Sequence, residues 1–445
     1  AGFSPDAYNN LCAGTSAGSS SSSSCYNIAL GQSAGTSLSG GDSNIFLGCC
    51  AGSATSNTCY NIMIGHSAGQ CATVTDDGIC NVILGAEAGK CMAGNAARNI
   101  TIGTCAGYRI CNGDDNIFVG TNSGYNTCDG SNFNVFVGRL SGCCNTTGDC
   151  SVFIGVNAGK FVTTGNRNVF IGADAGGGVN NKTGDDNVAI GCHAGHCLTS
   201  GYTNVLIGDQ AGCSLSGGTS DVFIGDGAGQ CACGSYNIYI GHETGQGTTT
   251  VSNNYGCYNI AFGIWAGRNI TNGMSNILLG YNSGCCISSG CCNIFLGRNS
   301  GSSNTSGCYN IALGTEVCLP SATGNHQFAV GNGSCHWLRG DSSFNLCLGC
   351  STAIKAMASG TICATCFVGN GTGLTGVGFD PDADQNLVAG TNAGICLDGS
   401  SGCCNVLLGY FAGRTISSGY TNVIIGNDAG CNALTAYCNV FIGDR

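Results

Sequence analysis

One nine-residue pattern, repeated along nearly the whole chain, constrains what this sequence can fold into. It reads Asn, three apolar residues, Gly, two variable residues, a small residue and Gly. Two clear copies are marked by Asn44, Phe46 and Gly48 and by Asn168, Phe170 and Gly172. Two degenerate copies begin at Gln327 and Thr365. Successive copies start mostly 17 residues apart, which indicates a repeat protein.

Each repeat predicts one short strand followed by turns. The Asn-apolar-apolar-apolar-Gly part is rich in β-branched and aromatic residues and is closed by Gly, which is typical of a strand. The remainder, such as residues 36–43, is rich in Ser, Gly and Asp, which favour turns. We therefore predict an all-β protein, a parallel β-solenoid (β-roll or β-helix) of about 25 rungs. At about 4.8 Å for each rung it would form a rod of roughly 120 Å.

Stacking in register would give the repeated residues distinct roles. Asn44 and its equivalents would form a ladder of side-chain amides along the rod. Because side chains alternate along a strand, we expect Ile45 and Leu47 to line the interior and Phe46 to face outward. A Phe-rich outer stripe would exceed the apolar patch that a soluble monomer tolerates. The sequence therefore predicts lateral self-association, most simply a homotrimer, with the Ala-Gly pairs at its axis or at a tight corner.

The repeat divides the chain into three sections. Residues 1–314 are regular rungs, residues 315–385 are expected to be an irregular, decorated section of the same rod, and regular rungs resume over residues 386–445. Residues 2–18 return as residues 378–394, so the last section is expected to begin a second copy of a larger unit. This long-range repeat predicts either that the chain is part of a longer repetitive protein or that rods stack end to end into a filament.

The Asn-apolar-x-apolar-Gly-x-x-Ala core resembles the repeats of phage tail-fibre proteins, particularly of cyanophage type. It is also similar to the head repeats of trimeric autotransporter adhesins. Residues 331–345 and 360–377 resemble recurring segments of such fibres as well. The resemblance implies a homotrimer, extracellular or on the virion surface, that acts as a spacer or binds a cell-surface glycan or receptor. The chain departs from these families in its many cysteines.

Most of the 36 cysteines lie at two places of the repeat, just before the strand Asn or just after the Ala-Gly pair. One loop carries both sets, namely Cys285, Cys286, Cys291 and Cys292. Loop ends and equivalent places on adjacent rungs can both meet the Cα separation of about 4.4–6.8 Å that a disulfide needs. We therefore predict structural disulfides within loops, between rungs or between chains, in an oxidising compartment, with the pairing left open.

A rival interpretation of the cysteines is metal binding. Its best candidates are clustered in one loop and are Cys192, His193, His196 and Cys197. Thiolate and imidazole are the ligands that zinc prefers. The chain contains only six His, so the sequence assigns no metal and no cofactor, and buried free thiols are the third interpretation.

Composition argues against several functions. With 13 Lys and Arg the chain offers no basic face for nucleic acid, and it has no long apolar run that would predict a membrane span. Acids such as Asp42, Asp114 and Asp221 lie in turns rather than as the paired carboxylates of a glycosidase. We therefore expect a structural fibre rather than an enzyme: a rigid, disulfide-stapled spacer or appendage with adhesive loops. The alternatives are a glycan-binding or glycan-cleaving spike and a metal-binding surface protein.

Overall fold

The computed structural model describes residues 6–21, 23–74, 79–128, 130–178, 182–248, 254–343, 346–348, 384–397 and 402–444. The chain forms two compact units, Ala1–Lys355 and Ala356–Arg445. Both consist of strands and turns, which confirms the predicted all-β parallel β-solenoid. Within the described residues no helix is long and apolar enough to cross a membrane.

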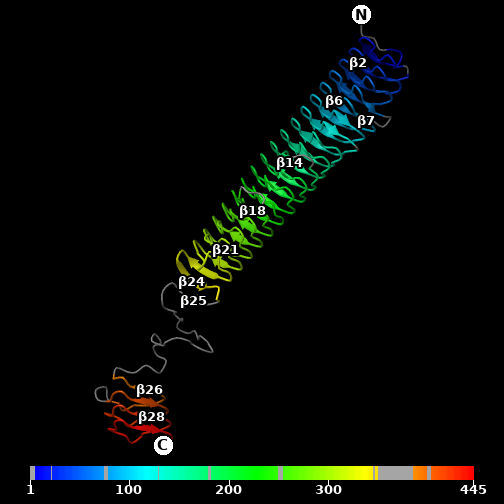
Figure 1. Cartoon of the computed structure of the whole chain (residues 1–445). Helices are drawn as coiled ribbons and strands as arrows, with labels where there is room; N and C mark the ends of the chain where they lie inside the picture. Colours follow the sequence, from blue (N-terminus) through cyan, green and yellow to red (C-terminus); the bar gives the residue numbers. More distant parts are fainter. Residues whose placement is uncertain are drawn as a thin grey trace. The chain divides into compact units, whose positions relative to one another are not determined.

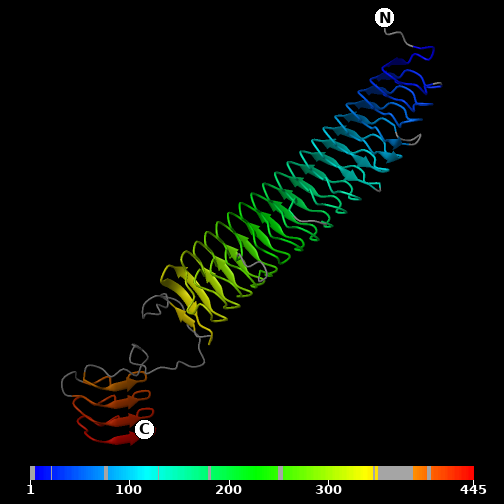
Figure 2. The ribbon, with the colours of Figure 1, turned by 45° about the horizontal axis from the view of Figure 1, so that its top comes forward.

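In the first unit the repeated strands stack into one continuous sheet, which Figure 1 and Figure 2 show from two directions. Each strand pairs parallel and in register with the strand of the next rung, as Ile45 does with Ile62. The stacked strands are β1 (Leu11–Ala13), β2 (Ile28–Leu30), β3 (Ile45–Leu47), β4 (Ile62–Ile64), β6 (Val82–Leu84), β8 (Ile100–Ile102), β10 (Ile117–Val119), β12 (Val135–Val137), β13 (Val152–Ile154), β14 (Val169–Ile171), β15 (Val188–Ile190), β16 (Val205–Ile207), β17 (Val222–Ile224), β18 (Ile238–Ile240), β19 (Ile260–Phe262), β20 (Ile277–Leu279), β21 (Ile294–Leu296), β22 (Ile311–Leu313) and β23 (Phe328–Asn332).

Shorter strands complete the two units. The 21-stranded sheet ends with β24 (Cys335–Gly340) and β25 (Leu346–Leu348), which are added antiparallel. Parallel rungs thus continue past residue 314 to β23, whereas residues 349–383 of the predicted irregular section lie outside the described residues. Two-residue strands form small second sheets at a corner, namely β5 (Thr73–Val74) with β7 (Ala93–Gly94) and β9 (Arg109–Ile110) with β11 (Asn126–Thr127). The second unit is a parallel sheet of four strands, β26 (Leu387–Ala389), β27 (Val406–Leu408), β28 (Val423–Ile425) and β29 (Val440–Ile442).

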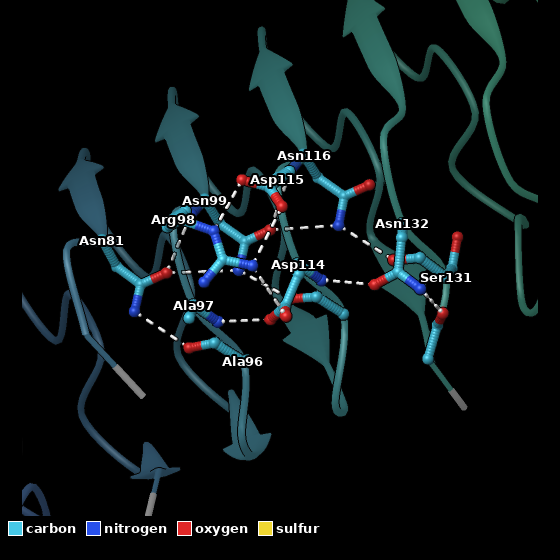
Figure 3. Close-up of polar contacts among 12 residues, drawn as sticks. Asn81, Ala96, Ala97, Arg98, Asn99, Asp114, Asp115, Asn116, Ser131 and Asn132 are labelled. Atoms are coloured by element: carbon cyan, nitrogen blue, oxygen red, sulfur yellow. Dashed lines mark hydrogen bonds and ion pairs between the residues drawn. The ribbon is translucent and has the colours of Figure 1, made fainter. Parts of the chain in front are cut away.

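A ladder of buried asparagine side chains connects the rungs, as the sequence predicts (Figure 3). Asn99 is representative: its backbone N–H and its Nδ2 donate to Asn81 Oδ1 at 2.9 and 3.2 Å. Its Nδ2 also donates to the carbonyl oxygen of Gly113 on the next rung at 2.7 Å. Its Oδ1 in turn accepts the backbone N–H and the Nδ2 of Asn116. Every polar atom of this side chain is therefore satisfied without water. Asn44 and Asn168 occupy the same position in their rungs.

A second row of acceptors lies two residues before many of the ladder asparagines. Here a side chain accepts the backbone N–H of the equivalent residue on the preceding rung. Ala97 N donates to Asp114 Oδ1 at 2.9 Å, and Asp114 N donates to Asn132 Oδ1 at 2.7 Å. Next to this row, Arg98 pairs with Asp114 and Asp115 across the rungs (Figure 3). The acids predicted to form turns thus also join neighbouring rungs.

The middle residue of each strand points into the coil, so the orientation predicted for Phe46 is wrong. Phe46 and Phe170 are buried, whereas Ile45 and Leu47 are only partly buried. Asn44, Phe46 and Gly48 alternate along the strand and therefore share one face, and the buried asparagine ladder makes that face the interior. The Phe rings stack from rung to rung, with centroid separations of 5.1, 4.7 and 5.1 Å from Phe118 through Phe136 and Phe153 to Phe170.

Two glycines in each rung are fixed by close contacts. Gly48 has φ of 133°, and a Cβ there would lie 2.5 Å from the carbonyl oxygen of Gly65 on the next rung. Gly172 has the same relation to Gly191. Gly52, the Gly of the Ala-Gly pair, has φ of 58°, and a Cβ there would lie 2.6 Å from the Phe46 ring. The Ala-Gly pair is therefore at a tight corner over the interior Phe, which decides between the two predicted positions.

Asp221 is the one described ladder position occupied by an acid. Its Oδ1 accepts from the backbone N–H and Nδ2 of Asn237, as an asparagine would, but its buried Oδ2 has no hydrogen-bond partner. Where Asn has an Nδ2 that donates, an ionised carboxylate has only another acceptor. Burial raises the pKa of Asp221 to about 7. The hydrogen bonds from Asn237 act in the opposite direction and lower this pKa, but by less than burial raises it.

Replacing Asp221 by Asn should stabilise the solenoid, and more so at high pH. Because the folded-state pKa lies above that of the unfolded chain, the native state holds the proton more tightly, and stability falls as the pH rises from about 4 through about 7. We expect Asp221→Asn to remove this pH-dependent loss, which amounts to up to about 4 kcal/mol in the free energy of unfolding. Urea unfolding followed by circular dichroism at several pH values measures it. Asn116→Asp should have the opposite effect, and identical pH profiles for wild type and Asp221→Asn would refute this account.

Candidate functional site

The outward side of the stacked sheet is apolar along its length. We define the outer strand face as the first and third residues of β2–β4, β6, β8, β10 and β12–β22. All of these residues are Ile, Val, Leu or Phe. Most are half-buried by their neighbours along the column, while some remain largely exposed, such as Ile154 at 38% and Leu296 at 48%. The residues predicted to line the interior therefore form the exposed apolar surface of the first unit.

Aromatic side chains accompany this face. The residue immediately before each ladder asparagine adopts a left-handed conformation and is often an exposed aromatic residue, namely Tyr26, Tyr60, Phe133, Tyr236, Tyr258 or Tyr309. Where two of them follow each other they stack, as Tyr236 and Tyr258 do with centroids 5.1 Å apart and rings nearly parallel. Exposed Tyr beside an apolar surface is a composition typical of protein interfaces.

The cysteines do not form the predicted disulfides in the described part of the chain, where all 32 cysteines whose side chains are described are thiols. Their sulfur contacts join sequence neighbours or adjacent rungs. The Sγ atoms of Cys285 and Cys286 lie 3.7 Å apart, and Cys111 Sγ lies 3.6 Å from Cys128 Sγ one rung on. A disulfide requires about 2.05 Å, so these are thiol contacts.

Cysteines two residues before a ladder asparagine act as acceptors in the second row. Cys308 Sγ accepts the backbone N–H of Cys291 at 3.2 Å, and Cys59 Sγ accepts that of Asp42 at 3.3 Å. Cys292, which follows Cys291 in the sequence, is exposed. In the loop that carries Cys285, Cys286, Cys291 and Cys292, the observed sulfur contacts therefore run to a neighbour in sequence and to the next rung. Position in the rung explains these cysteines better than a disulfide framework does.

The predicted Cys/His cluster is assembled only in part. Cys192 Sγ lies 3.0 Å from His193 Nδ1, and Asp209, at the equivalent place on the next rung, adds a carboxylate. The three ligand atoms lie within 4.8 Å of one another. The His196 ring is 5.2 Å from the His193 ring, and its Nδ1 lies 3.3 Å from the carbonyl oxygen of Asp174. Cys197 lies at a different corner position of the rung, where its N–H donates to Cys213 O at 2.8 Å.

The corner that carries this cluster is acidic. Partial burial, followed by the charges of Asp209 and Asp174, raises the pKa of Cys192. One rung beyond Asp209, Asp226 lies 3.5 Å from the His242 imidazole. Sequence reasoning missed Asp209, although its offset of 17 residues from Cys192 is the repeat period and would have placed the two side by side.

No protein-family model, no curated protein and no solved structure matches this chain. The resemblance to phage tail fibres and adhesin heads therefore stays a prediction, and function has to be argued from the outer strand face and the corners of the solenoid.

Oxidation should join Cys111 to Cys128. Equivalent residues on adjacent rungs are about 4.8 Å apart, which suits a disulfide. Closing a loop of about 17 residues should add about 3 kcal/mol to the free energy of unfolding. Peptide mapping after mild oxidation identifies the bond, and urea unfolding measures its effect. Cys111→Ser should abolish the gain and Cys318→Ser should not. Recovery of Cys111 and Cys128 as separate thiols would contradict the prediction.

Proposed function

We propose that this chain is a structural rod that associates side by side with further copies of itself through the outer strand face. The observation that supports the proposal is the unbroken apolar character of that face from β2 to β22. A soluble monomer rarely exposes a contiguous apolar patch larger than about 300–600 Å². We thus retain the self-association that the sequence predicts. The residues that would form the contact are the Ile, Val and Leu residues of the outer strand face rather than the Phe residues in the middle of the strands.

The size of the face suits a second copy as its occupant. Strands of three residues are about 10 Å wide, and about 17 rungs at about 4.8 Å span roughly 80 Å, which gives about 800 Å² for each chain. A stable protein interface buries about 800 Å² on each partner. The partner must also be long, straight and apolar with the same rung spacing, and an identical rod meets all of these requirements. Facing sheets would pack about 10 Å apart, as paired sheets do in stacked cross-β structures.

Within this proposal the protein serves as a stiff extracellular or virion-surface fibre, a spacer or appendage with loops available for adhesion. Continuous rung-to-rung hydrogen bonds supply the stiffness, and the thiols on adjacent rungs supply sites for cross-links in an oxidising compartment. The homotrimer and the end-to-end filament are forms that this association can take. A glycan-binding or glycan-cleaving spike stays the alternative.

Lysines on the outer strand face should dissociate the assembly without unfolding the rod. We expect wild type to have a solution mass that is a multiple of 44.4 kDa and the triple variant Ile171→Lys, Ile207→Lys, Ile240→Lys to be a monomer of 44.4 kDa. Charged residues on a half-exposed sheet face repel a second copy but leave the interior unchanged. Light scattering coupled to gel filtration measures the mass, and circular dichroism confirms the fold.

A control variant carries the same charge elsewhere. Ser37, Ser200 and Ser216 are exposed turn residues, and their replacement by Lys should leave the wild-type mass unchanged. Wild type that remains a monomer at micromolar concentration would refute self-association through this face. Equal dissociation by both triple variants would show that net charge, not the face, controls assembly.

A further inference from the structure

We propose that Cys192, His193 and Asp209 bind one divalent transition-metal ion of the zinc class at a corner of the solenoid. The thiolate of Cys192, a ring nitrogen of His193 and the carboxylate of Asp209 are the ligands. This site differs from the set predicted from the sequence, because it includes Asp209 and omits Cys197. It is independent of the proposed self-association.

The distances between the ligand atoms fit such a site. Zinc bonds of about 2.3 Å to sulfur and about 2.0–2.2 Å to nitrogen and oxygen, at tetrahedral angles, hold the ligand atoms about 3.3–3.6 Å apart. The Sγ of Cys192 and the Nδ1 of His193 are 3.0 Å apart, and all three ligand atoms lie within 4.8 Å of one another. Cys192 and Asp209 are exposed and His193 is half-buried, so small side-chain rotations bring the atoms to bonding distance.

The backbone at this corner is held by the rungs on both sides. His193 N donates to Ala173 O on the preceding rung at 3.0 Å, and Gln210 N donates to Cys192 O at 2.9 Å. His193 itself adopts φ of 54°, the left-handed conformation repeated at this corner of each rung. Lys182 Nζ donates to the carbonyl oxygens of His196 and Leu198 at 2.7 Å and so fixes the chain that follows. The backbone that carries the ligands is therefore already ordered before a metal ion binds.

The ligand types and the surrounding charge select the class of ion. A sulfur, nitrogen and oxygen set suits zinc and similar transition metals, whereas magnesium and calcium require oxygen ligands. Asp174 on the preceding rung adds negative charge near the site and so favours a cation. Three protein ligands leave one coordination position for water, or for His196, whose ring is 5.2 Å from that of His193.

The test must separate this site from the chain's many other thiols. His193→Ala and Asp209→Asn each remove one ligand but keep every cysteine, so the thiol background is unchanged. Equilibrium dialysis of the reduced full chain against Zn²⁺ with a non-chelating phosphine reductant, followed by elemental analysis, counts the bound metal. We expect each variant to lose one zinc equivalent, or to bind it at least tenfold more weakly. Titration with Co²⁺ should show a weaker thiolate charge-transfer band in both variants.

Asp226→Asn is the matched control, because Asp226 occupies the same place in the next rung but lies outside the cluster. It should bind as much zinc as wild type. Circular dichroism should show that all three variants fold, since the changes lie at a corner away from the interior. If His193→Ala and Asp209→Asn bind the wild-type amount of zinc with the wild-type cobalt spectrum, the binding belongs to other thiols and the proposal is wrong.

Discussion

The buried asparagine ladder is the interaction on which the rest of the structure depends. An amide removed from water must find partners for all of its donors and acceptors, because an unsatisfied buried polar group costs about 1–3 kcal/mol. Each ladder asparagine finds them on the preceding rung and on the next rung, so the rungs can stack in only one register. That register then aligns the Phe rings, the corner glycines and the second row of acceptors.

Substitutions in the ladder show what the position requires. Ser151 accepts the N–H of Asn168 through its hydroxyl at 3.2 Å, and Gln327 donates through Nε2 to Gly324 O at 2.7 Å. Ser151 keeps the inter-rung bond to the backbone, whereas the Gln327 bond lies within its own turn. Asp221 keeps the acceptor but loses the donor, and the cost appears as the raised pKa of its carboxyl group. The ladder therefore tolerates Ser151, whose hydroxyl both accepts and donates, and penalises the ionised Asp221, which accepts but cannot donate.

The sequence predicts the fold well because period, strand signal and Asn agree, but it does not by itself orient the strand. The outward orientation predicted for Phe46 assumes that the two flanking apolar residues form the core. Alternation from the buried Asn44 would have given the correct face. For the cysteines, composition predicts disulfides, whereas Cys59 and Cys308 occupy the place of Asp42 and Asp114 in the second row of acceptors. The metal candidates that the sequence indicates lie within one loop, whereas Asp209 lies one repeat period away from Cys192.

The polar groups inside most rungs are satisfied by the neighbouring rungs, whereas the apolar outer strand face has no partner within the described part of the chain. This contrast is the basis for the proposed lateral assembly, and cryo-electron microscopy of the purified chain tests it most directly. We predict rods with rungs about 4.8 Å apart whose Ile, Val and Leu columns face another copy across about 10 Å. Isolated single rods with that face exposed to solvent would contradict the account.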